Sequence, residues 1–152
     1  MHIYLGYDHA GRPLRDVVIA AVEALGGTIT DLGSEGDIHD DYPDFAFAVA
    51  KKVAEDPSAK GILMCGTGAG MAIAANKIAG IRAATADTEQ VAQMIRSDND
   101  ANILALAGRI LSAELAQKVV TMFLNTPFEG GRHQRRVSKI MALENQQPSN
   151  ND

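Results

Sequence analysis

The only cysteine of the chain begins a glycine-rich turn, in the run Cys65-Gly66-Thr67-Gly68-Ala69-Gly70. Residues 61–64 before it are typical of a buried strand, and residues 71–77 after it favour a helix. Such a strand-turn-helix junction points backbone N–H groups and the positive end of a helix at the space above the thiol. An anion could therefore be held beside the sulfur. The alternative role for a lone cysteine is that of a small buried hydrophobe.

Other residues suited to ligand binding lie next to predicted strands. They are Asp8 and His9 after the first strand, Asp41 and Tyr42 after the second, and Asn99, Asn102 and Arg109 around the fifth. Because ligands of open parallel sheets bind beyond the carboxyl ends of the strands, we expect these groups to meet at one edge. Two alternatives stay open: Asp8 and His9 could form a helix cap with a surface histidine, and Asp41-Tyr42-Pro43-Asp44 could be only a helix start.

Three kinds of site are disfavoured by motif and spacing. The glycines are spaced G-x-G-x-G in mid-chain, which is neither a dinucleotide fingerprint nor a Walker A loop. The four histidines have no metal-ligand spacing, so we expect no metal site; they are His2, His9, His39 and His133. A Cys-His nucleophile pair is a minor alternative, because no histidine lies near Cys65 in sequence.

Composition limits the class of protein. The 152 residues, 46% of them hydrophobic, suit one domain over residues 1–144, followed by a polar tail, residues 145–152, that we expect to be disordered. One cysteine excludes an internal disulfide, and the absence of a long apolar run or signal peptide predicts a cytoplasmic protein without membrane contact. A net charge of -5 without tryptophan argues against nucleic acid. The basic cluster Arg132, His133, Arg135 and Arg136 instead favours a small anionic ligand, although it could be a solvated helix end.

The alternation of short apolar runs with longer amphipathic ones predicts an α/β fold with a parallel sheet and crossover helices. We predict strands over residues 2–6, 28–32, 61–64, 81–85 and 103–106. We predict helices over residues 14–25, 42–54, 70–78, 88–96, 112–125 and 132–144. The expected architecture is a Rossmann-like, five-stranded αβα sandwich in three layers, closed by a C-terminal helix.

Several motifs in order resemble one known family. They are Asp8-His9-Ala10-Gly11, Asp41-Tyr42-Pro43, CGTGAGMAIAANKIAGIRAA from Cys65, NDAN from Asn99, Gly108-Arg109 and FEGGRHQRRVSKI from Phe128. Together they resemble ribose-5-phosphate isomerase B and its galactose-6-phosphate isomerase relatives over almost the whole chain. The resemblance implies metal-free interconversion of aldose and ketose phosphates through an enediol, with no cofactor. It also implies a homodimer or tetramer with the active site at the subunit interface.

The resemblance implies roles for individual residues. Cys65 would be the base that takes a proton from C2 of the aldose and returns one to C1. Thr67 and the N–H groups of Gly66, Gly68 and Gly70 would form the anion hole for the enediolate. Sugar contacts would come from Asp8, His9, Tyr42 and Asn99, the last often supplied by the partner subunit. Phosphate contacts would come from His9, Arg109, Arg132, His133 and Arg136, where guanidinium groups suit phosphate oxygens.

One position departs from the pattern. The family usually has a ring-opening histidine before the first asparagine of NDAN, whereas this chain has Asp98. An ionised aspartate can accept a proton from the anomeric hydroxyl but cannot donate one to the ring oxygen. Three outcomes are compatible with this: Asp98 opens the ring by another protonation scheme, His9 or His133 helps, or the substrate needs little opening.

The leading hypothesis is isomerisation of ribose 5-phosphate and ribulose 5-phosphate. The alternatives are isomerisation of a tetrose 4-phosphate, allose 6-phosphate or galactose 6-phosphate, and a non-catalytic sugar-phosphate sensor. A tetrose 4-phosphate cannot close a furanose ring, which would suit Asp98. A sensor has no evident need for Cys65 and Thr67.

Overall fold

The chain folds around one five-stranded parallel sheet with the strand order β2-β1-β3-β5-β4. The computed structural model describes residues 1–144, so the predicted polar tail, residues 145–152, lies outside the described residues. The strands are β1 (His2–Tyr7), β2 (Thr28–Asp31), β3 (Lys60–Cys65), β4 (Ala83–Thr85) and β5 (Ile103–Ala107). The helices are η1 (Arg12–Leu14), α1 (Arg15–Ala24), α2 (Tyr42–Glu55), α3 (Ala69–Ala75), α4 (Glu89–Ser97), α5 (Ala113–Asn125) and α6 (Arg132–Glu144).

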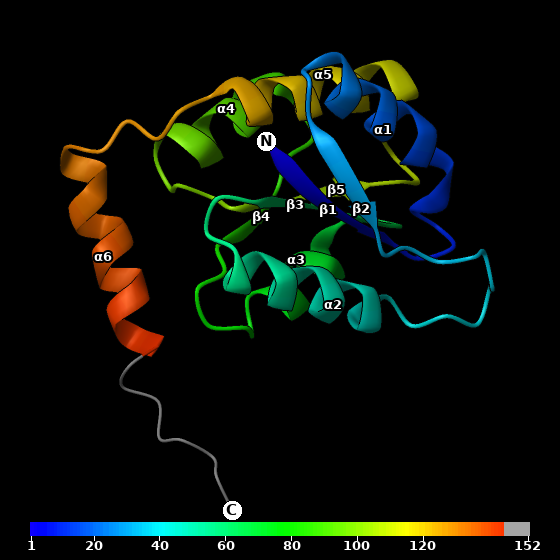
Figure 1. Ribbon diagram of the computed structural model, residues 1–152, viewed down its shortest axis with the longest axis horizontal. Helices are drawn as coiled ribbons and strands as arrows, with labels where there is room; N and C mark the ends of the chain where they lie inside the picture. Colours follow the sequence, from blue (N-terminus) through cyan, green and yellow to red (C-terminus); the bar gives the residue numbers. More distant parts are fainter. Residues whose placement is uncertain (145–152) are drawn as a thin grey trace, which may run out of the picture.

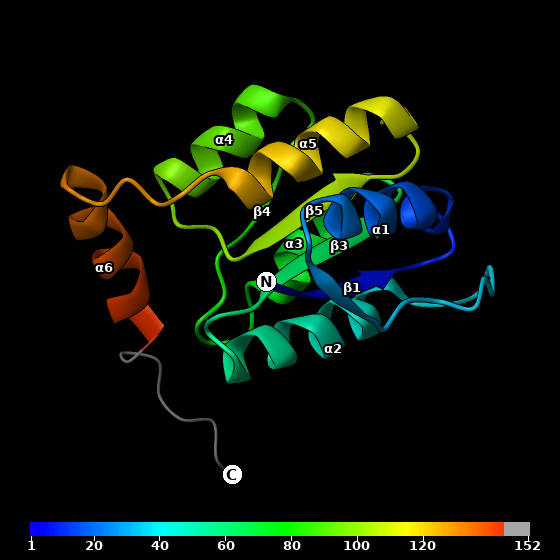
Figure 2. The same cartoon turned by 45° about the horizontal axis from the view of Figure 1, so that its top comes forward.

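The helices cover both faces of the sheet. Helices α1, α4 and α5 lie on one face and α2 and α3 on the other (Figure 1, Figure 2). The predicted three-layer αβα sandwich is therefore confirmed, including its C-terminal helix α6. Within residues 1–144, no helix is both long and apolar enough to cross a membrane.

The central strand β3 separates two hydrophobic cores. Its side chains alternate between faces, so Ile62 and Met64 pack beneath α1 and α5, whereas Leu63 and Cys65 pack beneath α2 and α3. Burial on both faces explains the continuous apolar run that identified this strand in the sequence. The consequence for the site is that the Cys65 side chain faces the α2–α3 layer, at the strand's carboxyl end.

Two helix starts follow from capping side chains. The Thr88 hydroxyl accepts a hydrogen bond from the Val91 N–H at 3.2 Å, and the Ser112 hydroxyl accepts one from the Leu115 N–H at 3.2 Å. Each bond satisfies a backbone donor of the first helical turn that has no partner inside the helix. The predicted starts at residues 88 and 112 are thus the N-caps of α4 and α5.

Two predicted boundaries differ in the segment between α3 and β4. Helix α3 ends at Ala75, because the Asn76 side chain bonds both backbone groups of Ala83, at 2.7 Å to its N–H and 2.8 Å to its carbonyl. Strand β4 begins at Ala83 rather than residue 81, since the Ile81 N–H still donates to the Ile78 carbonyl in a turn. Asparagine commonly stabilises turns in this way, which hydrophobic periodicity does not reveal.

Candidate active site

Cys65 is the last residue of β3 and is 5% exposed. Gly68, three residues on, has a φ of 75°, in the left-handed region that favours glycine. This turn aims the Gly68 N–H back at the sulfur, and the N to Sγ distance is 3.2 Å. A hydrogen bond donated to sulfur stabilises a thiolate more than a thiol. The turn therefore places a backbone donor directly against the Cys65 sulfur.

This bond changes the predicted anion hole. The sequence analysis assigned the N–H groups of Gly66, Gly68 and Gly70 to a bound anion, but the Gly68 N–H is already engaged by the thiol. The other two glycines permit close packing: a Cβ on Gly66 would lie 3.1 Å from an Arg109 guanidinium nitrogen, and one on Gly70 would lie 2.7 Å from the Tyr42 ring. Arg109 and Tyr42 thus flank the turn on either side.

Asp8 lies beside the same turn, because β1 and β3 are neighbours in the sheet. Its N–H donates to the Met64 carbonyl at 3.2 Å, and its side chain is buried. One carboxylate oxygen accepts hydrogen bonds from the N–H groups of Ala10 and Gly11, both at 2.9 Å. Asp8 Oδ1 therefore closes a turn after β1 and is not a helix cap, because the N-cap of η1 is Gly11, which has no side-chain capping bond. Asp8 Oδ2 accepts no hydrogen bond from the residues that the structure describes.

His9 is held by a residue that the sequence analysis did not single out. Asp40, in the loop before α2, accepts a hydrogen bond from His9 Nδ1 at 2.7 Å and one from the His9 backbone N–H at 3.3 Å. Burial would raise the pKa of the Asp40 carboxyl, but hydrogen bonds from Ser34 and His9 hold this pKa below its ordinary value. The only signal in the sequence was an acidic residue in a loop rich in glycine and aspartate. The pairing itself was concealed because Asp40 follows His9 by 31 positions.

The predicted site residues described so far lie around Cys65 and form a first set. A second set, which includes Asp98 and His133, lies where α4 ends and α6 begins. The Asp98 carboxylate accepts a hydrogen bond from the Ser97 hydroxyl at 2.6 Å and lies 3.8 Å from Nε2 of His133. The His133 ring is buried, and Glu129 approaches it at 3.5 Å. Sequence reasoning missed Glu129. The histidines show no metal-ligand spacing along the sequence. In the fold, however, His9 and His133 each lie near two carboxylates.

Asn99 is followed in the chain by Asp100, which is the centre of a cluster of charged side chains. Asp100 has a φ of 48°, and its carboxylate bonds Arg82 at 3.0 Å and Arg96 at 2.8 Å. Arg96 is buried and also donates to the Ala101 carbonyl at 2.7 Å. These bonds offset the cost of a left-handed conformation at a residue other than glycine. Asn99 itself is exposed and lines a hollow of about 380 Å³ beside Ile140 of α6.

The two sets lie at opposite edges of the sheet, so the expectation of a single edge is wrong for Asn99 and Asn102. These residues precede β5 and therefore lie at its amino end, where the Asn102 carbonyl accepts a hydrogen bond from the Gly61 N–H. Cys65 pairs with Ala107, four residues beyond the Gly61 pairing, which separates the edges by about 13 Å. Helix α6 and the loop before α2 lie at opposite ends of the molecule (Figure 1).

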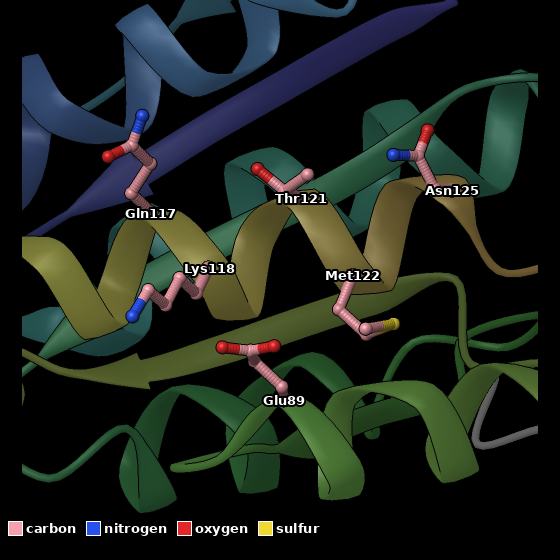
Figure 3. Close-up of a pocket in the computed structure, with 6 residues that line it drawn as sticks. All are labelled: Glu89, Gln117, Lys118, Thr121, Met122 and Asn125. Atoms are coloured by element: carbon pink, nitrogen blue, oxygen red, sulfur yellow. The ribbon is translucent and has the colours of Figure 1, made fainter.

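The hollows of the surface are consistent with this separation. Thr67 is exposed and lines a hollow of about 250 Å³ with Thr85 and Asp87, distinct from the one lined by Asn99. Another hollow, of about 410 Å³, lies between α4 and α5 and contains Glu89 and Lys118 (Figure 3). None of the predicted site residues lines that third hollow. The predicted site residues thus lie in two separate sets in the single chain.

A family model described as Ribose/Galactose Isomerase matches residues 3–140. The chain belongs to the ribose/galactose isomerase family. A member of this family from Mycoplasma pneumoniae, named as a probable ribose-5-phosphate isomerase B, is 45% identical over 143 residues, which cover 93% of this chain and 94% of the relative. The family resemblance drawn from the motifs is therefore confirmed.

Two further family members bear on the substrate. The crystal structure of ribose-5-phosphate isomerase B from Mycoplasma genitalium with bound ribulose 5-phosphate is 40% identical, has a TM-score of 0.92, and covers 96% of this chain and 97% of its own. A D-erythrulose-4-phosphate isomerase from Pectobacterium atrosepticum is 36% identical over 151 residues, with 97% of each chain covered. The family thus includes isomerases of five-carbon and four-carbon sugar phosphates.

Proposed function

We propose that residues 1–144 form one isomerase domain that interconverts ribose 5-phosphate and ribulose 5-phosphate in the cytoplasm, without a metal or cofactor. The observation that carries the proposal is the Cys65 thiol, bonded by the Gly68 N–H at 3.2 Å, at the sheet edge that also holds Asp8 and His9. Membership of an isomerase family whose relatives act on this sugar phosphate supports the substrate.

The chemistry assigned to this site is proton transfer between neighbouring carbons. The Cys65 thiolate takes the proton from C2, the C2 electron pair forms the C1=C2 bond, and negative charge passes to O1. The thiol then returns a proton to C1 while C2 and its oxygen become a carbonyl and the O2 proton moves to O1. Thr67 and the N–H groups of Gly66 and Gly70 stabilise the charged oxygen, because fixed donors aimed at developing charge lower the barrier.

The ends of the substrate are held by the remaining groups. Asp8 and Tyr42 bind sugar hydroxyls, with Asp8 using Oδ2, the oxygen that accepts no turn hydrogen bond. His9 and Arg109 bind the phosphate from the Cys65 side. Arg132, His133 and Arg136 complete the phosphate site, and Asp98 and Asn99 contact the sugar from the second set.

We propose that the two sets combine between two copies of the chain, in a homodimer or tetramer. Only His133 and Val137 of α6 are buried, so most of this helix, including Arg132 and Arg136, is exposed in the single chain. A second copy that places its own α6 and Asn99 segment over Cys65 would close a site that one chain leaves open. Most soluble homo-oligomers have such closed symmetry, which repeats the shared site in each subunit.

Subunit mixing tests the shared site. Cys65→Ala and Arg132→Ala homo-oligomers should each be nearly inactive. In a mixed dimer both changes fall in one of the two shared sites, so the other site is intact. Random mixing makes about half of the dimers mixed, so about a quarter of wild-type activity should be restored. The measurement is turnover of ribose 5-phosphate after the two chains are co-expressed.

The control pairs Cys65→Ala with Tyr42→Ala, two changes in the same set. No mixed dimer of these variants contains an intact site, so activity should stay near background. Equal recovery in both mixtures, or recovery in neither, would contradict the shared site.

A tetrose 4-phosphate is the second candidate substrate, and Asp98 favours it. The Asp98 carboxylate accepts a hydrogen bond from Ser97, so it is placed as an acceptor and not as a proton donor to a ring oxygen. A four-carbon sugar 4-phosphate needs no ring opening, and one family member is named for such a substrate. A turnover panel over four-, five- and six-carbon aldose phosphates decides between these candidates.

Asp98→His should raise turnover of ribose 5-phosphate at least tenfold, because a positioned general acid contributes roughly 10²–10⁴-fold. Turnover of a tetrose 4-phosphate should change little. Asp98→Asn, which removes the charge without adding an acid, is the matched control and should show no gain on ribose 5-phosphate. Unchanged or reduced turnover in Asp98→His would mean that Asp98 is not simply a weakened ring opener.

The sensor alternative is tested by isotope exchange. Purified protein should exchange the C2 proton of ribose 5-phosphate with deuterated water, because the proposed base removes that proton in each catalytic cycle. A protein that binds the sugar phosphate without any exchange would be a sensor.

A further inference from the structure

His9 and Asp40 form a two-point contact between separate segments of the chain. Asp40 Oδ1 accepts one hydrogen bond from the His9 backbone N–H at 3.3 Å and one from His9 Nδ1 at 2.7 Å. The main chain and the ring of His9 therefore bind the same carboxylate oxygen. The Asp40 side chain is 10% exposed and that of His9 is 30% exposed. The carboxylate is therefore largely screened from water, while part of the imidazole remains accessible.

The charge on Asp40 determines which ring nitrogen carries a proton. Hydrogen bonds from Ser34 and His9 outweigh burial and keep the pKa of Asp40 below its ordinary value, so this group is a carboxylate at neutral pH. A carboxylate only accepts hydrogen bonds, so Nδ1 must be the donor. The second nitrogen, Nε2, has no partner among residues 1–144.

The surroundings of His9 are charged on several sides. Asp8 at the end of β1 brings a carboxylate oxygen into the same group, within 4.8 Å of the His9 and Asp40 atoms. Arg12 of η1 donates to the Ser34 carbonyl on the loop that carries Asp40. Two carboxylates thus lie near one imidazole, and that of Asp40 contacts its Nδ1 directly.

We propose that Asp40 is a positioning residue that fixes the His9 ring, with Nδ1 bonded to the carboxylate and Nε2 presented to the phosphate of the substrate. The proposal rests on the proposed function for the identity of that phosphate. Asp40 touches no reacting atom and acts only through His9. Its two bonds to His9 leave Nε2 as the ring nitrogen that faces a ligand.

The variant that separates charge from orientation is Asp40→Asn. Its amide oxygen can still accept both His9 hydrogen bonds, but the negative charge is gone. KM and the Ki for inorganic phosphate should rise roughly fivefold, with kcat changed much less, because a charge-assisted bond from His9 to Asp40 is about twice as strong as a neutral one. Asp40→Ala loses both orientation and charge, so it should bind phosphate more weakly still.

The matched control is Asp37→Asn in the same loop. Asp37 is exposed, and its carboxylate accepts one backbone hydrogen bond, from the His39 N–H at 2.9 Å. The same substitution there removes the same charge without touching His9, so KM and the Ki for inorganic phosphate should match those of the wild type. An equal effect of both changes would contradict a specific role for Asp40.

A readout without turnover is the ¹⁵N spectrum of the histidine rings, with His9→Gln used to assign the His9 signals. The wild type should hold a proton on Nδ1 of His9, and inorganic phosphate should perturb Nε2. A ring with the proton on Nε2 and none on Nδ1 would overturn the proposal. So would an Asp40→Asn protein with lower thermal stability but unchanged KM and phosphate Ki, since that is a purely structural role. If the wild type isomerises no sugar phosphate, the proposed function fails, whereas ring spectra and phosphate binding still decide the role of Asp40.

Discussion

The Cys65→Ala variant is expected to lose isomerisation, with kcat lowered about 10⁴-fold, the upper range for removal of a general base. The thiol accepts a hydrogen bond directly from the Gly68 N–H, at 3.2 Å, at the start of the turn. The substituted methyl group fits the same buried position at the end of β3. The Ki for inorganic phosphate should change less than about twofold, because phosphate is held by other side chains.

Cys65→Ser is the matched control for this change. A hydroxyl can accept the same hydrogen bond from Gly68 but is a much weaker base, so its activity should be nearly as low as that of the alanine variant. Turnover is measured by the rate of ketose formation, and folding by thermal unfolding of both variants. Wild-type turnover in either variant would remove Cys65 as the base.

The Gly11→Ala variant should show the largest loss of stability. A Cβ at this position would lie 2.2 Å from the Met64 carbonyl oxygen and 2.4 Å from its carbon. The φ of Gly11 is -83°, which any residue adopts, so the cost arises from overlap alone. The overlapped atoms are backbone of the central strand β3 and cannot move aside cheaply. We expect the free energy of unfolding to fall by about 3 kcal/mol or more, measured by denaturant unfolding.

Gly26→Ala provides the comparison. Gly26 has a φ of 72° and nothing within 4 Å of its Cβ position, so substitution costs only the left-handed backbone, about 1 kcal/mol. A Gly11→Ala protein as stable as Gly26→Ala would show that the loop after β1 can shift away from β3. Because Met64 adjoins Cys65, Gly11→Ala should also lower turnover in whatever fraction folds.

The main elements were predictable because their signals are local. Residues 61–64 and 103–106 are apolar runs buried on both faces, and Thr88 and Ser112 cap the helices that follow them. The predicted element boundaries were wrong where a side chain, and not another backbone group, binds the backbone. Asn76 does this between α3 and β4. Periodicity reports which face of an element is buried, and it does not report where such a side chain ends the element.

The site was less predictable than the fold. Residue types and the family motifs identified Cys65 and its turn, but not that the Gly68 N–H bonds the sulfur. The pairing of His9 with Asp40 depends on a loop of irregular conformation, which no sequence period describes. Placing Asn99 at the carboxyl edge was wrong, because a residue before a strand lies at the strand's opposite end.

Asp100 has a consequence for the entropy of binding. Its left-handed backbone and its bonds to Arg82 and Arg96 tie the end of α4 to the start of β4. The segment that carries Asp98 and Asn99 therefore has its shape before any ligand arrives. A preorganised segment loses little conformational freedom when a sugar binds, so more of the contact energy of Asn99 is retained as affinity.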